Sequence, residues 1–358
     1  MIVFLLLFGL IVSYGVTGLY RRYALAHRVL DVPNQRSSHT VPTPRGGGVG
    51  IVAAWLLGLG LLTATGRLDP QFSLALGVGG AVIALLGWWD DRAGLRPVTR
   101  LIVQCVVAVW TVAWLGGGPE LRLGAGDVAL GPWGVFPSIL GLVWLTNLYN
   151  FMDGIDGLAG SEAVTAGATA ALLFASADAP GLAALSALLA AGAAGFLIWN
   201  WPPARIFMGD VGSTFLGYAF GAIALAGDRA TGIPATLLLL PLAVFIMDAT
   251  WTLLRRLIRG ERVYEAHRSH VYQRLVQYGW SHARVTLTVV MCNLGLAASA
   301  WIALRRLDLL PTILAGITLF LGVAGWVALR SAARSQSGPV GAIALPESES
   351  PRSALRSE

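Results

Sequence analysis

Two carboxamides and two carboxylates recur every three residues in the stretch Asn147-Leu-Tyr-Asn150-Phe-Met-Asp153-Gly-Ile-Asp156-Gly, directly after an apolar run. At this spacing the four side chains line one side of a helix end, before the glycines break the helix. Mg²⁺ prefers such oxygen ligands and also binds substrate phosphates. The alternative is a polar cluster that only holds membrane helices together. The pattern favours a cation site and leaves the structural cluster open.

Two further acidic motifs could belong to the same site. Asp90 and Asp91 are adjacent acids at the end of an apolar run, where they repel each other and need a cation or another function. A solvated acid pair is the alternative. Asp210 begins another apolar run, where the helix dipole favours an acid; a plain N-cap, which is common, is the alternative. Asp248 lies inside an apolar run, where a structural and a functional role are both open.

Two basic segments could bind phosphate. In the segment 31–48, prolines keep the chain extended and glycines let backbone N–H groups approach a phosphate. In the most basic segment, the histidines and arginines of His267-Arg-Ser-His270 could clamp a diphosphate. An ordinary connector and a surface-exposed basic loop are the respective alternatives.

Long apolar runs must position these motifs. The chain has 358 residues, of which 56% are hydrophobic and 12% charged, whereas soluble chains carry about 25% charged residues. Because a helix needs about 20 apolar residues to cross a bilayer, we expect an all-α polytopic membrane protein with about eleven transmembrane helices. The runs lie near residues 2–20, 46–65, 72–89, 98–116, 134–149, 159–178, 181–199, 211–227, 233–254, 283–304 and 309–329.

The arginines predict the orientation of these helices. Twenty of the 25 basic residues, all arginines, lie in loops after odd-numbered runs or in the C-terminal tail. The positive-inside rule therefore places these loops and the C-terminus in the cytoplasm and the N-terminus outside. Every dense polar motif then falls on the cytoplasmic side. The net charge of +6 fits membrane topology and anionic lipid, so we expect no nucleic-acid partner.

Composition also limits the architecture and the chemistry. The chain contains no lysine, which excludes Schiff-base chemistry, and its two cysteines lie inside apolar runs, which argues against a disulfide framework. We expect one membrane domain over residues 1–330 and a disordered cytoplasmic tail over 331–358. The alternating segment 120–131 predicts a small extracytoplasmic hairpin.

The motifs, taken together, resemble those of the polyprenyl-phosphate N-acetylhexosamine-1-phosphate transferases, which are of the glycosyltransferase family 4 type and related to muramoyl-pentapeptide transferase. The resemblance covers residues 1 to about 330, in motif order. Its blocks are Asp31-x-Pro-x-x-Arg36-x-x-His39 with Pro44-Arg-Gly-Gly, Asp90-Asp91, Asn147-x-x-Asn150-x-x-Asp153-Gly-x-Asp156-Gly, and Phe207-Met-Gly-Asp210-x-Gly-Ser213.

This resemblance implies the transfer of a sugar 1-phosphate from a UDP-N-acetylhexosamine to undecaprenyl phosphate in the bilayer, with release of UMP, as an early step of O-antigen or other cell-envelope polysaccharide synthesis. The enzyme would sit in the bacterial inner membrane, and a homodimer is left open. Asn150 and Asp210 would ligate Mg²⁺, with Mn²⁺ as an alternative, and Asp90 and Asp91 would be catalytic. The residues implied in substrate binding are Asp31, Arg36, His39, Arg45, Asp153, Asp156, Asn200, His267, Arg268 and His270.

Chemistry independent of the resemblance points the same way. Phosphoryl transfer needs charge neutralisation and in-line positioning more than covalent chemistry. With a second pKa of about 6, the acceptor phosphate is largely ionised, so no strong base is required, although Asp90 could take its last proton. We favour direct attack; a phospho-aspartate intermediate stays open.

The donor sugar and the function class each have an alternative. The segment His267-Arg-Ser-His270-x-Tyr-Gln departs from a His-x-His-His pattern and looks like the branch that uses UDP-N-acetylfucosamine or UDP-N-acetylquinovosamine rather than UDP-N-acetylglucosamine. Tyr272 and Gln273 would give a flatter, less charged surface beside His270. Intramembrane acids could instead indicate a cation-coupled transporter, but most acids gather at one membrane face.

Overall fold

Helices dominate the chain because, within a bilayer, backbone N–H and C=O groups must be bonded inside the segment itself. The computed structural model describes residues 2–33, 41–118, 121–122, 127–128, 131–262 and 267–336. The helices are α1 Ile2–Ala26, α2 Val49–Ala64, α3 Pro70–Ala93, α4 Pro97–Trp114, α5 Val135–Met152, α6 Leu158–Ser176, α7 Pro180–Asn200, α8 Asp210–Thr231, α9 Ala235–Leu238, α10 Ala243–Ile258, α11 Val271–Gln277, α12 His282–Arg305 and α13 Leu310–Gln336. Short 3₁₀ turns are η1 Gly131–Gly134, η2 Leu240–Leu242 and η3 Leu307–Leu309.

The expected apolar runs coincide with helices, but not all of them are simple spans. Within the described residues, eight helices are long and apolar enough to cross a membrane, which makes the chain an all-α polytopic membrane protein. The run 233–254 is divided into α9, η2 and α10, with Pro241 inside η2. Because proline interrupts helical hydrogen bonding, this run is not one continuous helix. A count of eleven transmembrane helices is therefore not established by helix length and hydropathy.

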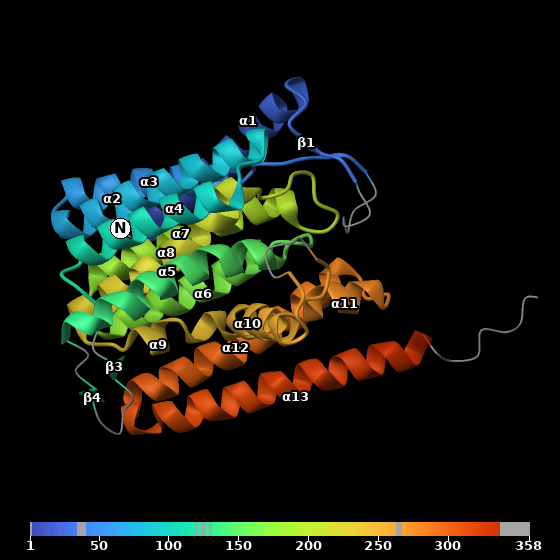
Figure 1. The fold of residues 1–358 in the computed structure, drawn as a ribbon. Coiled ribbons are helices and arrows are strands. Elements are labelled where there is room, and N and C mark those ends of the chain that lie inside the picture. The colour runs from blue at the N-terminus through green and yellow to red at the C-terminus, as the bar shows by residue number, and fades with distance from the viewer. Residues whose placement is uncertain are drawn as a thin grey trace, which may run out of the picture.

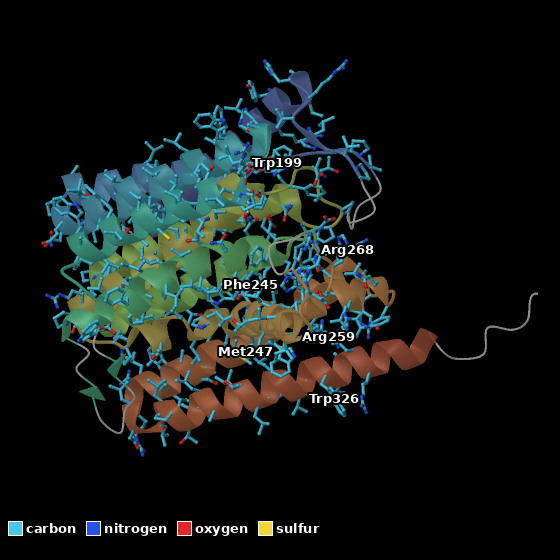
Figure 2. All side chains as sticks on the ribbon, in the orientation of Figure 1. Trp199, Phe245, Met247, Arg259, Arg268 and Trp326 are labelled. Atoms are coloured by element: carbon cyan, nitrogen blue, oxygen red, sulfur yellow. The ribbon has the colours of Figure 1, made fainter. Side chains whose placement is uncertain are left out.

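The centre of the bundle is formed by α7 and α8, as Figure 1 shows. Helix α7 packs against α1, α2 and α6, whereas α8 packs against α3 and α5. Helix α7 consists largely of small residues, which let neighbouring helices approach closely in the absence of a hydrophobic driving force. Helix α12 covers α6, and α13 lies outermost. Figure 2 shows Trp326 pointing away from the bundle on α13, while Phe245 of α10 is fully buried.

Two antiparallel strand pairs lie at opposite ends of the bundle (Figure 1). Strand β1 (Leu30–Asp31) pairs with β2 (Thr43–Pro44), and β3 (Leu121–Arg122) pairs with β4 (Asp127–Val128). The second pair confirms the hairpin expected within 120–131. It lies at the end of the bundle opposite α11 (Figure 1). Helix α13 continues past residue 331 to Gln336, and the rest of the expected tail lies outside the described residues.

Candidate active site

The ends of α3, α5 and α7 and the beginnings of α4, α6 and α8 lie at the same end of the bundle (Figure 1). Asp90 and Asp91 occupy the last turn of α3, and Asp210 is the first residue of α8. One oxygen of Asp91 accepts the backbone N–H of Asp210 at 2.8 Å, and the other accepts that of Val211 at 3.2 Å. Asp91 therefore caps α8 from the neighbouring helix, and three acids separated in sequence become neighbours.

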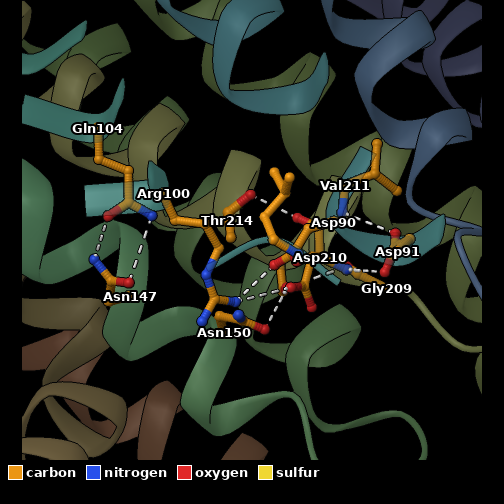
Figure 3. A network of polar contacts seen from close by, with 12 residues as sticks. Asp90, Asp91, Arg100, Gln104, Asn147, Asn150, Gly209, Asp210, Val211 and Thr214 are labelled. Atoms are coloured by element: carbon orange, nitrogen blue, oxygen red, sulfur yellow. Dashed lines mark hydrogen bonds and ion pairs between the residues drawn. The ribbon is translucent and has the colours of Figure 1, made fainter. Parts of the chain in front are cut away.

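Two arginines link these acids. Arg45 donates to Asp91 through Nε at 3.0 Å and through Nη2 at 2.5 Å, and its Nη2 lies 3.6 Å from Asp210. Arg100 on α4 donates to Asp90 at 2.6 Å and lies 3.5 Å from the other oxygen of Asp210 (Figure 3). Asp210 thus sits between two guanidinium groups at distances longer than those of the tight pairs, and its carboxylate also contacts that of Asp90.

Arg100 is a site residue that the sequence motifs did not identify. It lies shortly after Pro97, at the start of an apolar helix, and in the sequence it serves only as one of the arginines that indicate membrane orientation. A guanidinium inside an apolar run needs a carboxylate or phosphate partner, and that requirement was the available signal. The nearer partner, Asp90, is only ten residues away and already belonged to a motif, whereas the second partner, Asp210, is far away in sequence.

Helix α5 brings amides to the cluster. Asn150 accepts the Ser213 hydroxyl of α8 at 3.0 Å through Oδ1. One turn earlier, the amide of Asn147 donates to Gln104 of α4 at 2.7 Å, and Gln104 returns a longer bond at 3.4 Å (Figure 3). Asn150 therefore faces the acids, whereas Asn147 joins α5 to α4 behind them.

Asp153 follows the end of α5 and is set apart from the other acids by its surroundings. No hydrogen-bond donor from the described residues reaches its carboxylate. Burial raises the pKa of the Asp153 carboxyl well above its usual range, and the negative charges of Asp210 and Asp91 raise it further. A raised acid pKa of this kind is typical of a functional site with surplus negative charge.

Two of the three glycines of the first loop, Gly47 and Gly48, do not offer their amides to a phosphate as expected. Gly47 donates its N–H to the Phe207 carbonyl at 2.9 Å, and Gly48 donates to the Met208 carbonyl at 2.9 Å. These bonds join the first loop to the segment before α8. Gly209 follows with a φ of 74°, a conformation that favours glycine, and this turn delivers Asp210 to Asp91.

Asn200 and Asp156 join the loop after α5 to the segment after α7. The Asn200 amide accepts from Gly157 N–H at 2.9 Å and donates to the Ile206 carbonyl at 3.0 Å. Asp156 accepts from Ala204 N–H at 3.0 Å and lies 3.3 Å from Nδ1 of His282, a residue that the motifs did not identify. Both side chains therefore shape the loops, and Asp156 is also close enough to Asp153 to raise its pKa.

Comparison with known proteins connects this arrangement to a family. Residues 73–228, which hold Asp90, Asp91 and Asp210, match the model of glycosyl transferase family 4. The chain is 31% identical over 298 residues to a probable undecaprenyl-phosphate N-acetylglucosaminyl 1-phosphate transferase of Bacillus subtilis (strain 168), with 80% of each chain covered. The chain belongs to glycosyl transferase family 4.

Other members of glycosyl transferase family 4 are similar over a comparable length. A decaprenyl-phosphate N-acetylglucosaminephosphotransferase of Mycolicibacterium smegmatis is 32% identical, over 78% of this chain and 77% of that protein. A phospho-N-acetylmuramoyl-pentapeptide-transferase of Rippkaea orientalis is 29% identical, over 82% and 84%. The resemblance inferred from the motifs is confirmed, and the relatives are named as phosphotransferases with polyprenyl-phosphate or muramoyl-pentapeptide substrates.

The histidine segment of this family 4 member lies before α11. The rings of His267 and His270 are 4.9 Å apart between centroids. Burial, together with the nearby His270 and Arg256, lowers the pKa of His267 to about 4. At neutral pH the His267 imidazole is therefore uncharged and can contact a diphosphate only as a hydrogen-bonding group, so positive charge in this segment comes from arginines such as Arg268.

Tyr272 and Gln273 do not form the flat surface expected beside His270. Tyr272 is 2% exposed, and its hydroxyl donates to the Phe151 carbonyl at 2.9 Å. Gln273 accepts the backbone N–H of His270 at 3.3 Å as part of a capping box. Both side chains fix the start of α11. Because Tyr272 is buried, it gives no surface beside His270, and that part of the argument for a 6-deoxy sugar is wrong; Gln273 is partly exposed.

Asp248 has a structural role at the same helix. Its carboxylate accepts the N–H groups of Val271 at 2.9 Å and Tyr272 at 3.2 Å, and lies 3.4 Å from Nδ1 of His270. An acid placed against the first turn of a helix satisfies free N–H groups and complements the helix dipole. Of the two roles open from sequence, the structural one is therefore realised.

The remaining substrate-binding candidates lie in the first loop. Asp31 is in β1, opposite Thr43 of β2. Arg36 and His39 lie outside the described residues. Of this loop's candidates, Arg45 is brought into the acid cluster.

The donor set of the cluster fits a divalent cation by charge. The cluster contains the carboxylates of Asp90, Asp91, Asp153 and Asp210 and the guanidinium groups of Arg45 and Arg100. Two negative charges remain uncompensated when all four acids are ionised. Mg²⁺ typically binds through one or two carboxylates and completes its shell with water and substrate phosphates. Among the described residues, no three His, Cys, Asp or Glu side chains are grouped to hold a metal alone, so a metal here would need the Asn150 amide and substrate oxygens as well.

Proposed function

We propose that this family 4 member transfers an N-acetylhexosamine 1-phosphate from a UDP-sugar to undecaprenyl phosphate and releases UMP, at the start of O-antigen or other cell-envelope polysaccharide synthesis. The observation that carries the proposal is the meeting of Asp90, Asp91 and Asp210 with Arg45 and Arg100 at one end of a membrane bundle. The activities for which the relatives are named support the same reaction class.

The proposed reaction is an in-line displacement at the sugar-bearing phosphorus. An oxygen of undecaprenyl phosphate bonds to that phosphorus, while the bond to the bridging oxygen of the diphosphate breaks and UMP leaves with the electron pair. Because such a transition state gains mainly from positioning and charge neutralisation, the two arginines would hold phosphate oxygens. Asp90 would accept the last acceptor proton where one is present. Direct attack remains our preferred route over a phospho-aspartate intermediate.

Asn150 and Asp210 are the residues that would hold Mg²⁺, or Mn²⁺ in its place. Such a cation would neutralise the diphosphate charge. The longer distances from Asp210 to the two arginines support this role, because each arginine pairs more closely with Asp90 or Asp91. Asp153 and Asp156, on the loop that follows α5, would face the nucleotide-sugar together with Asn200 and the segment His267-Arg268-Ser269-His270.

We also propose that the site faces the cytoplasm in the bacterial inner membrane, with the N-terminus outside and residues 1–330 acting as one membrane domain. The arginine distribution supports this orientation. A reporter fused after Arg274 should then report a cytoplasmic position, and one fused after Arg122 a periplasmic position. The reverse pattern would rule out a cytoplasmic site.

The identity of the hexosamine is the most specific part of the proposal. The pattern of the histidine segment favours UDP-N-acetylfucosamine or UDP-N-acetylquinovosamine, whereas the relatives reported above are named for N-acetylglucosamine or muramoyl-pentapeptide. Since the buried Tyr272 provides no surface argument for a deoxy sugar, the preference rests on the sequence pattern alone. Transfer of each radiolabelled donor to undecaprenyl phosphate decides it, and a clear preference for UDP-N-acetylglucosamine would contradict the deoxy-sugar branch.

A cation-coupled transporter is the alternative function. Transporters bind their coupling ions near the middle of the membrane, whereas the clustered acids lie at helix ends, and Asp248 is engaged with the first turn of α11. Release of UMP by the purified protein, compared with uptake into sealed vesicles, separates the two functions.

A further inference from the structure

Tyr272 lies between the two segments expected to contact the donor. Its hydroxyl donates to the Phe151 carbonyl, at the end of α5, at 2.9 Å. Its ring stacks on the His270 imidazole with the centroids 5.7 Å apart. The side chain is 2% exposed. One buried residue therefore contacts both the histidine segment and the chain that leads to Asp153.

Gly154 leaves the space that Tyr272 occupies. A Cβ atom at Gly154 would collide with the Tyr272 hydroxyl and would lie 3.1 Å from Cζ of the ring. Because Gly154 does not have a positive φ, its backbone would accept an L-residue. Close contact with Tyr272, rather than conformation, is thus the reason that the described structure needs glycine at this position.

Helix α10 holds Tyr272 from the other side. The Asp248 carboxylate accepts the N–H groups of Val271 and Tyr272, and it also accepts the Thr252 hydroxyl at 3.1 Å. The Tyr272 backbone is fixed by α10 while its hydroxyl is fixed by α5. The ring therefore has little freedom to move away if the loop after α5 changes position.

We propose that Tyr272 is a positioning residue for the donor, which sets the loop that carries Asp153 and Asp156 at a fixed distance from the His267–His270 segment. The inference rests on the proposed function, because it assigns these two segments to the nucleotide-sugar. Tyr272 itself is too deeply buried to contact the sugar. Tyr272 instead determines how Asp153, Asp156 and the His267–His270 segment, which would contact the sugar nucleotide, are arranged.

The test uses the full-length protein with Tyr272→Phe, Gly154→Ala and the double variant. Tyr278→Phe is the matched control, since Tyr278 ends the same short helix and its hydroxyl bonds to none of the described residues. Loss of one buried hydrogen bond is worth about 1 kcal/mol, or about fivefold in binding. We expect Tyr272→Phe to raise the donor KM about fivefold, with kcat and acceptor KM unchanged and the melting temperature lowered by no more than a few degrees. Tyr278→Phe should behave as wild type.

The double variant tests the contact itself. Gly154→Ala should raise the donor KM more than Tyr272→Phe does, and removing the hydroxyl should relieve the collision. The double variant should therefore bind donor better than Gly154→Ala alone. Independent, multiplying effects would overturn the proposal, and so would a Tyr272→Phe variant with the wild-type donor KM. A parallel loss of kcat, both KM values and melting temperature would show a general structural role instead.

Donor binding without transfer separates this inference from the proposed function. Calorimetric titration with UDP-N-acetylglucosamine, UDP-N-acetylfucosamine and UDP-N-acetylquinovosamine needs no acceptor lipid. If wild type binds a donor but releases no UMP, the proposed function fails while the Tyr272→Phe comparison still tests the positioning role. If wild type transfers and Tyr272→Phe binds and transfers equally well, only the inference about Tyr272 fails.

Discussion

The Asp91 carboxylate accepts the backbone N–H of Asp210 at 2.8 Å, and this bond joins the last turn of α3 to the first turn of α8. The Asp91 side chain is fully buried, whereas that of Asp210 is 18% exposed. One acid therefore supports the backbone and the other presents its carboxylate. The two acids should respond differently to the same substitution.

Asp91→Asn should lower both stability and activity. Asparagine loses the charge that pairs with Arg45 and can accept only one of the two N–H bonds from α8, which leaves a buried donor unsatisfied at a cost of about 1–3 kcal/mol.

Asp210→Asn should leave the melting temperature unchanged or higher and reduce turnover by about a hundredfold or more, as expected for the loss of a charged group that acts in the transition state. Thermal unfolding and UMP release, measured on both variants, check this difference.

Asp308→Asn is the control for both, since Asp308 pairs with Arg306 at an exposed position remote from the cluster. Near-normal UMP release by Asp210→Asn at limiting Mg²⁺ would contradict its assignment as a metal ligand.

Arg100→Ala should reduce kcat by about a hundredfold, because Asp90 loses its partner at 2.6 Å and the phosphates lose one of two guanidinium groups. Arg100→Lys should recover part of this loss, since lysine keeps the charge but not the planar fork. Arg96→Ala, at the exposed start of the same helix, should retain wild-type kinetics. Equal rates for Arg100→Ala and Arg96→Ala would remove Arg100 from the site.

Asp153 gives the protein a pH-dependent stability with a definite sign. An acid whose pKa is raised on folding stabilises the folded chain fully below the ordinary carboxyl value of 3.8, and this stability is lost as the pH rises towards the raised value. In metal-free protein, Asp153→Asn should therefore melt at a higher temperature than wild type, by an amount that grows from pH 5 to pH 8. Added Mg²⁺ should stabilise wild type more than the variant. A wild-type protein that gains stability relative to Asp153→Asn with rising pH would contradict the assignment.

Much of the fold follows from the length of the apolar runs, because a helix bonds all its backbone N–H and C=O groups within one segment and can therefore cross a bilayer. The boundaries at Pro70, Pro97 and Pro180, each at the first turn of its helix, follow from local chemistry. Pro241 could have indicated the interruption of the run 233–254, but the residues on both sides of it are apolar, so the run resembled one continuous helix.

The candidate site was less completely predictable. The motifs that predict the site lie at the ends of helices or, for Arg45, directly after β2, and the structure brings them together: Arg45, Asp90, Asp91, Asn150 and Asp210. The contact of Arg100 with Asp210 and the orientation of Tyr272 depend on packing between helices that are remote in sequence. Glu162 illustrates the same limit: it lies in an apparently apolar run, and only α12 supplies its partner, Asn293, at 2.6 Å.

The most direct test of the proposed function is the nucleotide product formed by purified wild-type protein from undecaprenyl phosphate, Mg²⁺ and each of the three UDP-sugars. We predict UMP, formed together with an undecaprenyl diphosphate sugar, and loss of both products in Asp210→Asn and Arg100→Ala. Release of UDP would indicate transfer of the sugar without its phosphate. That result, or a wild-type protein that consumes no donor in the presence of lipid and Mg²⁺, would contradict the proposal.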